Sequence, residues 1–141
     1  MSSLYVRNEV KGFIETQWTA TDVVIAENVF DQQPPQNLQP WLTMLFSGGI
    51  EEHPCLGDIT VTRKRELGTI QFIVFVASGT GTDTALAYAE TVRTLIRGKN
   101  LNGVRLRNAD PPDTAIPSQV QSSAGNYFGY SVSCDYEYDF I

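Results

Sequence analysis

Two stretches of the chain carry apolar residues at every third or fourth position, which is the spacing of one face of an α-helix. The first runs from Ser2 to Trp18 and has its apolar residues at Leu4, Val6, Val10, Phe13, Ile14 and Trp18. The second runs from Thr82 to Arg97, ahead of Gly98, a residue type that commonly ends helices, and its shared face comprises Ala85, Ala89, Val92 and Ile96. The pattern predicts two amphipathic helices, each with one face to bury.

Strict alternation of apolar and polar residues, typical of a half-buried β-strand, is clearest near the end of the sequence. Every second residue from Phe128 to Phe140 is apolar, which predicts a long strand with one buried face. Gly125-Asn126 before it is a hairpin signal that pairs this strand with about Ser118–Ala124. The pattern predicts three further strands, at Val23–Ala26, Trp41–Phe46 and Val104–Arg107. Ser47-Gly48-Gly49 is predicted to end the second of them.

The middle of the chain predicts a β-hairpin. Ile59–Glu66 and Thr69–Ala77 have strand-like composition, and Leu67-Gly68 between them is a turn candidate because glycine accepts a positive φ. The first strand becomes polar at Arg63-Lys64-Arg65, which indicates that one end of the hairpin projects into water. The second strand is apolar on both faces after Gln71, as expected of a strand that is covered on two sides.

Two helices and six or seven strands, mostly joined by hairpins, predict an α+β fold. We expect an antiparallel or mixed sheet with both helices packed on it and with the hairpin projecting from it. The 141 residues have the length of one domain, so residues 1–141 are predicted to form a single domain.

The charge balance is acidic, with 16 Asp and Glu residues against 10 Lys and Arg residues and a net charge of −6. Affinity for nucleic acid comes mostly from cationic side chains that displace phosphate counterions, so this balance argues against nucleic-acid and membrane-surface binding. The sequence contains no run of about 18 apolar residues, the length that a membrane helix needs. It also lacks a cationic N-terminal segment followed by an apolar block, so we expect a soluble protein made in the cytosol.

Two loops contain residue types that bind cofactors or metals. Gly79-Thr80-Gly81-Thr82 precedes a predicted helix, where free N–H groups favour anions, but no lysine follows it and the third glycine of a dinucleotide motif is missing. An ordinary turn and helix cap is therefore favoured. Glu51-Glu52-His53-Pro54-Cys55 and Asp58 include metal-ligand types, but Cys134, the natural fourth ligand, is expected to point into the core. We predict no cofactor and no metal.

Nucleophilic catalysis would have to use His53, the one histidine in the sequence, and no Gly-x-Ser-x-Gly motif is present. Asp135, Glu137 and Asp139 alternate on one face of the last strand, where we expect them to be solvated. Like charges so close together destabilise a sheet unless cations sit opposite them. The sequence thus predicts no catalytic residue and no enzyme.

Interface residues are predicted at two places. Arg63, Lys64 and Arg65 near the tip of the predicted hairpin are suited to an acidic surface, and in an acidic protein a second copy of the chain offers one. The alternative is a charged edge that deters sheet aggregation. Trp41 is the kind of large aromatic residue that anchors interfaces, and its alternative role is core packing.

Several short features, read together, cover most of the chain: the helix ending near Trp18, Ile25-Ala26-Glu27-Asn28, the proline-rich loop into Pro40-Trp41-Leu42, Gly48-Gly49, the Gly68 hairpin leading to Phe75-Val76, and the Gly79–Gly81 loop before the helix Ala85–Arg97. In this combination the chain resembles the phage tail terminator-like family, which includes the lambda-like tail terminators. None of these features has a chemistry of its own, and the family offers no catalytic residue to carry over.

The resemblance implies a structural protein of the virion tail. Such proteins form a ring, usually hexameric, on the head-proximal end of the tail tube, stop its polymerisation, and offer the docking surface for the head connector. The implied partners are other copies of the chain, the tail tube protein and the head connector protein, with assembly in the host cytoplasm. A ring of acidic chains is expected to repel DNA phosphates, so that DNA passes through the lumen without specific binding. A lumen lined with Arg and Lys would contradict that hypothesis.

Two alternatives remain open from the sequence. One is another neck component, such as a head-completion protein. The other is a small ligand-binding or enzymatic α+β dimer that uses the Gly79 loop, which predicts a saturable ligand and a fixed small oligomer.

Overall fold

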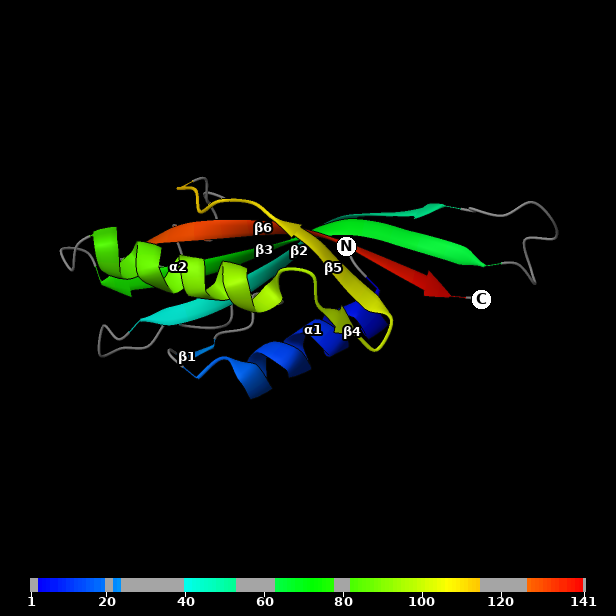
Figure 1. The fold of residues 1–141 in the computed structure, drawn as a ribbon, viewed down its shortest axis with the longest axis horizontal. Coiled ribbons are helices and arrows are strands. Elements are labelled where there is room, and N and C mark those ends of the chain that lie inside the picture. Colours follow the sequence, from blue (N-terminus) through cyan, green and yellow to red (C-terminus); the bar gives the residue numbers. More distant parts are fainter. Residues whose placement is uncertain are drawn as a thin grey trace.

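The computed structural model of the chain describes residues 3–19, 22–23, 40–52, 63–77, 82–114 and 127–140. Within these residues the chain forms two helices and one six-stranded sheet (Figure 1). The helices are α1 (Leu4–Gln17) and α2 (Thr82–Ile96). The strands are β1 (Asp22–Val23), β2 (Trp41–Glu52), β3 (Lys64–Ala77), β4 (Asn100–Leu101), β5 (Val104–Ala109) and β6 (Tyr127–Phe140).

The strand order is β1-β2-β3-β6-β5-β4. β1 pairs in parallel with β2 over two residues, and every other pair in this sheet is antiparallel. The predicted α+β fold is therefore confirmed. β6 lies at the centre beside β3, and β5 pairs with it on the other side, so that segments far apart in the sequence are neighbours here.

Both helices pack on the same face of the sheet, because their buried residues join one core cluster. The predicted buried face of α1 is confirmed, since Val6, Val10 and Ile14 are buried. The predicted end of α2 is confirmed as well, because the helix stops before Gly98, whose φ is +69°. The sheet contributes alternate residues to the same cluster, namely Leu42, Met44, Ile70, Phe72, Val74, Val132, Cys134 and Tyr136. Ile73 and Phe75, on the other face of β3, are also fully buried, which confirms the expected two-sided burial.

The predicted turn at Leu67-Gly68 is wrong. β3 runs without a break through these residues, and its hairpin partner is β2. Gly68 lies opposite Tyr136 on β6, and a Cβ atom at Gly68 would come within 2.7 Å of the Tyr136 ring. The glycine therefore makes room for an aromatic ring that packs across the strand and does not serve to turn the chain.

The predicted end of the second strand at Ser47-Gly48-Gly49 is also wrong. The register between β2 and β3 shifts between Ser47 and Ile50, and pairing then continues to Glu52. This irregularity is a β-bulge, in which one strand carries an extra residue and the pairing resumes beyond it. β2 is consequently longer than the sequence indicated.

The outer parts of β2, β3 and β6 extend beyond the helices (Figure 1). We call this extension the arm; it comprises Ile50–Glu52, Lys64–Leu67 and Glu137–Phe140. The projecting hairpin that the sequence predicted from Ile59–Glu66 and Thr69–Ala77 is wrong, because both flanks of Leu67-Gly68 belong to β3; the element that projects is the arm. Several predicted features lie outside the described residues: Val24–Asn28, the Gly79–Gly81 loop, and Ser118–Ala124 with its Gly125-Asn126 turn.

Candidate functional site

The charged side chains of the arm meet on the face of the sheet turned away from the helices. Arg65 on β3 lies in register with Asp139 on β6, and its guanidinium donates from Nε to Oδ1 at 2.7 Å and from Nη2 to Oδ2 at 3.2 Å. Arg105 on β5 donates to the same Oδ2 at 3.1 Å, and Arg63 Nη1 lies 3.9 Å from it. Asp139 is therefore surrounded by three guanidinium groups.

Glu137, two residues earlier on β6, is held in the same way. Arg105 Nε donates to its Oε1 at 2.8 Å, and Arg107 Nη2 donates to the same oxygen. Glu137 is only 6% exposed, and the side chain of Asp139 is largely covered as well. The prediction that these carboxylates are solvated is wrong for both, because the sheet places arginines from β3 and β5 over them. Arginines thus lie opposite the alternating acids Glu137 and Asp139, as the stability of the sheet requires.

These contacts hold both carboxylates in the charged form. The hydrogen bonds from Arg65 and then from Arg105 lower the pKa of Asp139 to about 2. The hydrogen bond from Arg107 is the largest cause that lowers the pKa of Glu137. In return, the hydrogen bonds to Asp139 raise the pKa values of Arg65 and Arg105. The cluster consequently stays fully ionised across the physiological pH range.

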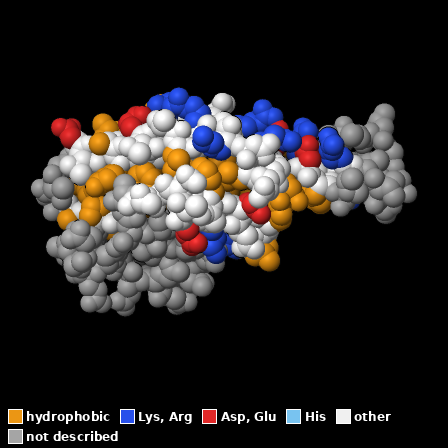
Figure 2. Space-filling view, turned by 60° about the horizontal axis from the view of Figure 1, so that its bottom comes forward, with side chains coloured by type: hydrophobic (Ala, Val, Ile, Leu, Met, Phe, Trp, Pro, Cys, Tyr) orange, Lys and Arg blue, Asp and Glu red, His pale blue; other side chains and the backbone are white. Residues whose placement is uncertain are grey.

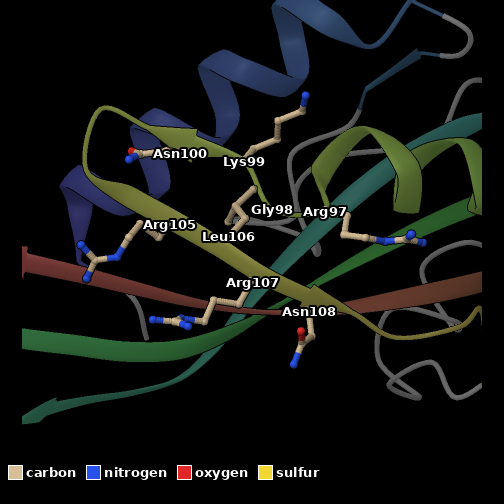
Figure 3. A pocket seen from close by; sticks show the side chains of 8 residues that line it. All are labelled: Arg97, Gly98, Lys99, Asn100, Arg105, Leu106, Arg107 and Asn108. Carbon is tan, nitrogen blue, oxygen red and sulfur yellow. The ribbon is translucent and has the colours of Figure 1, made fainter.

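A depression of about 500 Å³ continues from the arginine cluster towards the end of α2. Arg97, Lys99, Arg105 and Arg107 line it, and the N–H of Gly98 donates to the carbonyl of Arg107 at 3.3 Å. The labelled side chains splay apart and do not converge on one point (Figure 3). The depression is therefore open, and it does not form a closed pocket for a small ion.

We call the combined surface the basic strip; it comprises Arg63, Arg65, Arg97, Lys99, Arg105 and Arg107. Figure 2 shows Lys and Arg side chains gathered along one side of the molecule, with acidic side chains between and beyond them. Within the strip, Asp139 is shared by Arg63 and Arg105, and the depression connects Arg105 to Arg97 and Lys99 at the end of α2. Sequence reasoning identified Arg63 and Arg65 and missed the other four members.

The predicted interface residues occupy different environments. Arg63 is exposed, with 61% of its side chain accessible, whereas Lys64 is half-buried opposite Phe140 and Arg65 is paired with Asp139. Trp41 is buried in the single chain and stacks on the Phe75 ring, with 4.5 Å between the ring centroids. The packing role of Trp41 that the sequence left open is thus realised, and the interface roles of all four residues stay predictions.

The opposite face of the arm carries a row of aromatic rings. Tyr5 of α1 stacks on Tyr138 of β6 with ring centroids 4.7 Å apart, and Tyr138 stacks on Phe140 at 5.8 Å. The Tyr5 hydroxyl also donates to the carbonyl of Asn102, in the β4–β5 turn, at 2.8 Å. Leu4 beside it is 72% exposed. The arm therefore carries its arginine–carboxylate cluster on one side and its aromatic rings on the other.

The remaining chemical candidates give no site within the described residues. Glu51 and Glu52 end β2, whereas His53, Cys55 and Asp58 lie outside that part of the chain, in which no group of three or more potential metal ligands is found. Burial raises the pKa of the Cys134 thiol to about 12, so this thiol stays protonated.

Comparison with known proteins adds no family. No protein-family model matches the chain, and no curated protein matches it either. Neither α1 nor α2, the helices in the described part of the chain, is long and apolar enough to cross a membrane.

Proposed function

We propose that this protein works by assembly, as a phage tail terminator. In this proposal copies of the chain form a ring, hexameric as is usual in the family that the sequence resembles, on the head-proximal end of the tail tube. The ring stops tube polymerisation and offers a docking surface to the head connector, while DNA passes through its lumen. The protein would assemble in the host cytoplasm and remain in the virion tail, and no bond is made or broken.

The observation that carries the proposal is the arm. Three strands continue beyond most of the two helices (Figure 1), so this part of the sheet is covered by little more than the N-terminal end of α1, where Tyr5 stacks on Tyr138. Leu4 and Tyr5 on one side of it, and Ile50 on β2, are among the exposed large apolar residues of the described chain. Exposed apolar groups gathered on a projecting element are typical of a surface that another chain covers.

The distribution of charge supports contact between copies. Arg63 and Lys64 lie at the start of β3, on the tip of the arm, whereas Asp83 and Glu90 on α2 and Asp110 and Asp113 after β5 lie towards the other end of the sheet (Figure 1). A head-to-tail contact brings these opposite charges together. Head-to-tail contacts generate closed rings when the rotation between copies closes. Arg63 and Lys64, at the tip of β3, are the proposed contact residues.

Two measurements test this proposal together. Native mass spectrometry at increasing protein concentration is expected to show oligomers, with the hexamer as the largest closed species. Electron microscopy of virions assembled without this chain is expected to show overlong tails, because nothing stops the tube. Tails of normal length would contradict a terminator function, and a fixed dimer with a saturable small ligand would favour a binding protein. Labelling of a different ring of the neck would favour another neck component.

A further inference from the structure

We infer that the basic strip binds the phosphate backbone of nucleic acid without reading its base sequence. The inference goes beyond the proposed assembly role and does not require a ring. The strip holds six of the ten Lys and Arg residues of a chain whose net charge is −6. Such a local concentration of positive charge on an acidic protein creates a potential that attracts anions to that place.

Two of the six cations set the shape of the strip. Arg105 donates to both Glu137 and Asp139, and Arg65 makes two hydrogen bonds to Asp139. The carboxylates lie underneath, largely buried, so they fix the guanidinium planes while they present little negative charge to solvent. A fixed guanidinium loses less conformational entropy when it meets an anion.

The other four cations are open to a ligand. Arg63 is exposed to 61% and Arg107 to 58%, although each has a carboxylate nearby. Arg97 and Lys99 are exposed, and neither has an ion pair or a hydrogen bond through its side chain with any part of the chain that the structure describes. Arg97 lies just past the end of α2, where the helix dipole favours a cation.

The register of the sheet gives the length of the strip. Arg105 lies opposite Glu137 and Arg65 lies opposite Asp139, so Arg107 and Arg63 are separated by about six residues along β6. At about 3.3 Å per residue this separation is about 20 Å. A DNA strand carries one phosphate for about every 3.4 Å of helix axis, so a duplex lying along the strip presents about six phosphates per strand to it.

The composition of the depression, at the α2 end of the strip, favours phosphates over an acidic protein. Leu106 is the one large apolar residue that lines the depression, and it is buried. Protein interfaces commonly have an apolar or aromatic centre, whereas interfaces with nucleic acid are polar and rich in cations. Five of the six cations are arginines, whose planar forks match phosphate oxygens. The labelled side chains point in different directions and do not converge on a single ion (Figure 3).

The experiment is fluorescence anisotropy of the full chain with two labelled duplexes of about 30 base pairs and unrelated sequence, at salt from about 25 to 150 mM. We expect equal binding of both duplexes at low salt and a steep loss as salt rises. The variant R97Q/K99Q removes two cations whose side chains make no ion pair or hydrogen bond with the part of the chain that the structure describes. It is expected to weaken binding and to lower the slope of log K against log salt by about two.

A matched control separates local contacts from overall charge. The variant T91E/T94E lowers the net charge by the same amount, on two exposed α2 residues whose hydroxyls donate only to carbonyls of their own helix. It is expected to weaken binding less than R97Q/K99Q. The inference is overturned if neither duplex binds at low salt, if both variants weaken binding equally, or if polyglutamate binds more tightly than DNA, which would assign the strip to an acidic protein. Tighter binding of polyglutamate would leave the head-to-tail contact of the proposed ring standing, and tail length and ring formation are measured separately, so failure of this inference and failure of the proposed function can be distinguished.

Discussion

Arg65 and Asp139 face each other in register across β3 and β6 and form a two-bond ion pair, although they are 74 positions apart in the sequence. The pair sits on the face of the arm that is turned away from both helices. Since Arg105 reaches the same carboxylate from β5, one acidic side chain connects three strands. Ion pairs between side chains thus stabilise the arm in addition to the backbone hydrogen bonds between its strands.

Acid is expected to weaken the ion pairs of Asp139 with Arg65 and Arg105. The pKa of Asp139 is about 2 in the folded chain, below the value of about 3.9 for an unfolded aspartate, so folding favours the charged form. The resulting stabilisation is complete above about pH 4 and is lost as the pH falls through 2. In D139N, the thermal midpoint should fall less between pH 4 and pH 2 than in the wild type. D135N, which alters an exposed carboxylate of the same strand, serves as the control; a D139N profile parallel to the wild type would contradict the expectation.

Substitution G68A is expected to destabilise the fold by about 1–3 kcal/mol, the usual effect of overpacking. The new Cβ would lie 2.7 Å from the Tyr136 ring, which is buried and whose hydroxyl donates to Glu66 Oε2 at 2.6 Å, so the ring has no free path away. Urea unfolding measures the effect. In the control G12A nothing lies within 4 Å of the new Cβ, and alanine in a helix should stabilise by about 0.5–1 kcal/mol. Equal effects of the two variants would refute this explanation of Gly68.

Substitution L4E is expected to reduce self-association and to leave the stability of the single chain nearly unchanged. Leu4 is 72% exposed beside the aromatic row, so a charge there costs little in the monomer and is placed where another chain is proposed to pack. Sedimentation velocity over a concentration series measures association. L86E, at an exposed apolar residue of α2, is the control. If L86E disrupts association as much as L4E does, the arm is not the contact surface.

Salt and charge reversal test the tip of the arm. R63E/K64E should weaken association at about 50 mM salt and change it little at about 500 mM, where exposed charges are screened. The physical reason is that Arg63 is exposed and free to face an acidic end of a neighbouring copy. Because R63E/K64E lowers the net charge by four and T91E/T94E lowers it by two, R63Q/K64Q is measured beside T91E/T94E as the charge-matched pair. Association that is insensitive to both salt and R63E/K64E would remove these two residues from the interface.

The sequence predicted the elements whose pattern is local. α1, α2 and β6 were found because each carries one buried face along a continuous stretch, where periodicity reports burial directly. Gly68 was misread, because a glycine signal is the same whether the residue turns the chain or accommodates a ring from another strand. Only the pairing of β3 with β6 distinguishes these cases.

The basic strip was hidden for a related reason. Arg105 and Arg107 alternate on β5 in the same period as Glu137 and Asp139 on β6, and the need for cations opposite the acids was apparent from the sequence. About 30 residues separate the partners, however, and no local rule states which strands lie side by side. A search for strands with matching alternation of opposite charges would have suggested this pair.

The extra residue in β2 between Ser47 and Ile50 decides which side of the arm each later side chain faces. Because successive side chains of a strand point to opposite faces, one added residue reverses the assignment. Ile50 and Glu52 consequently share a face with Arg65, whereas Glu51 shares a face with Glu66. Loss of a single glycine from this segment would remove the bulge and leave Glu52 opposite Arg65, whereas a regular strand that kept both glycines would turn Glu51 towards the arginines and Ile50 towards the aromatic rings.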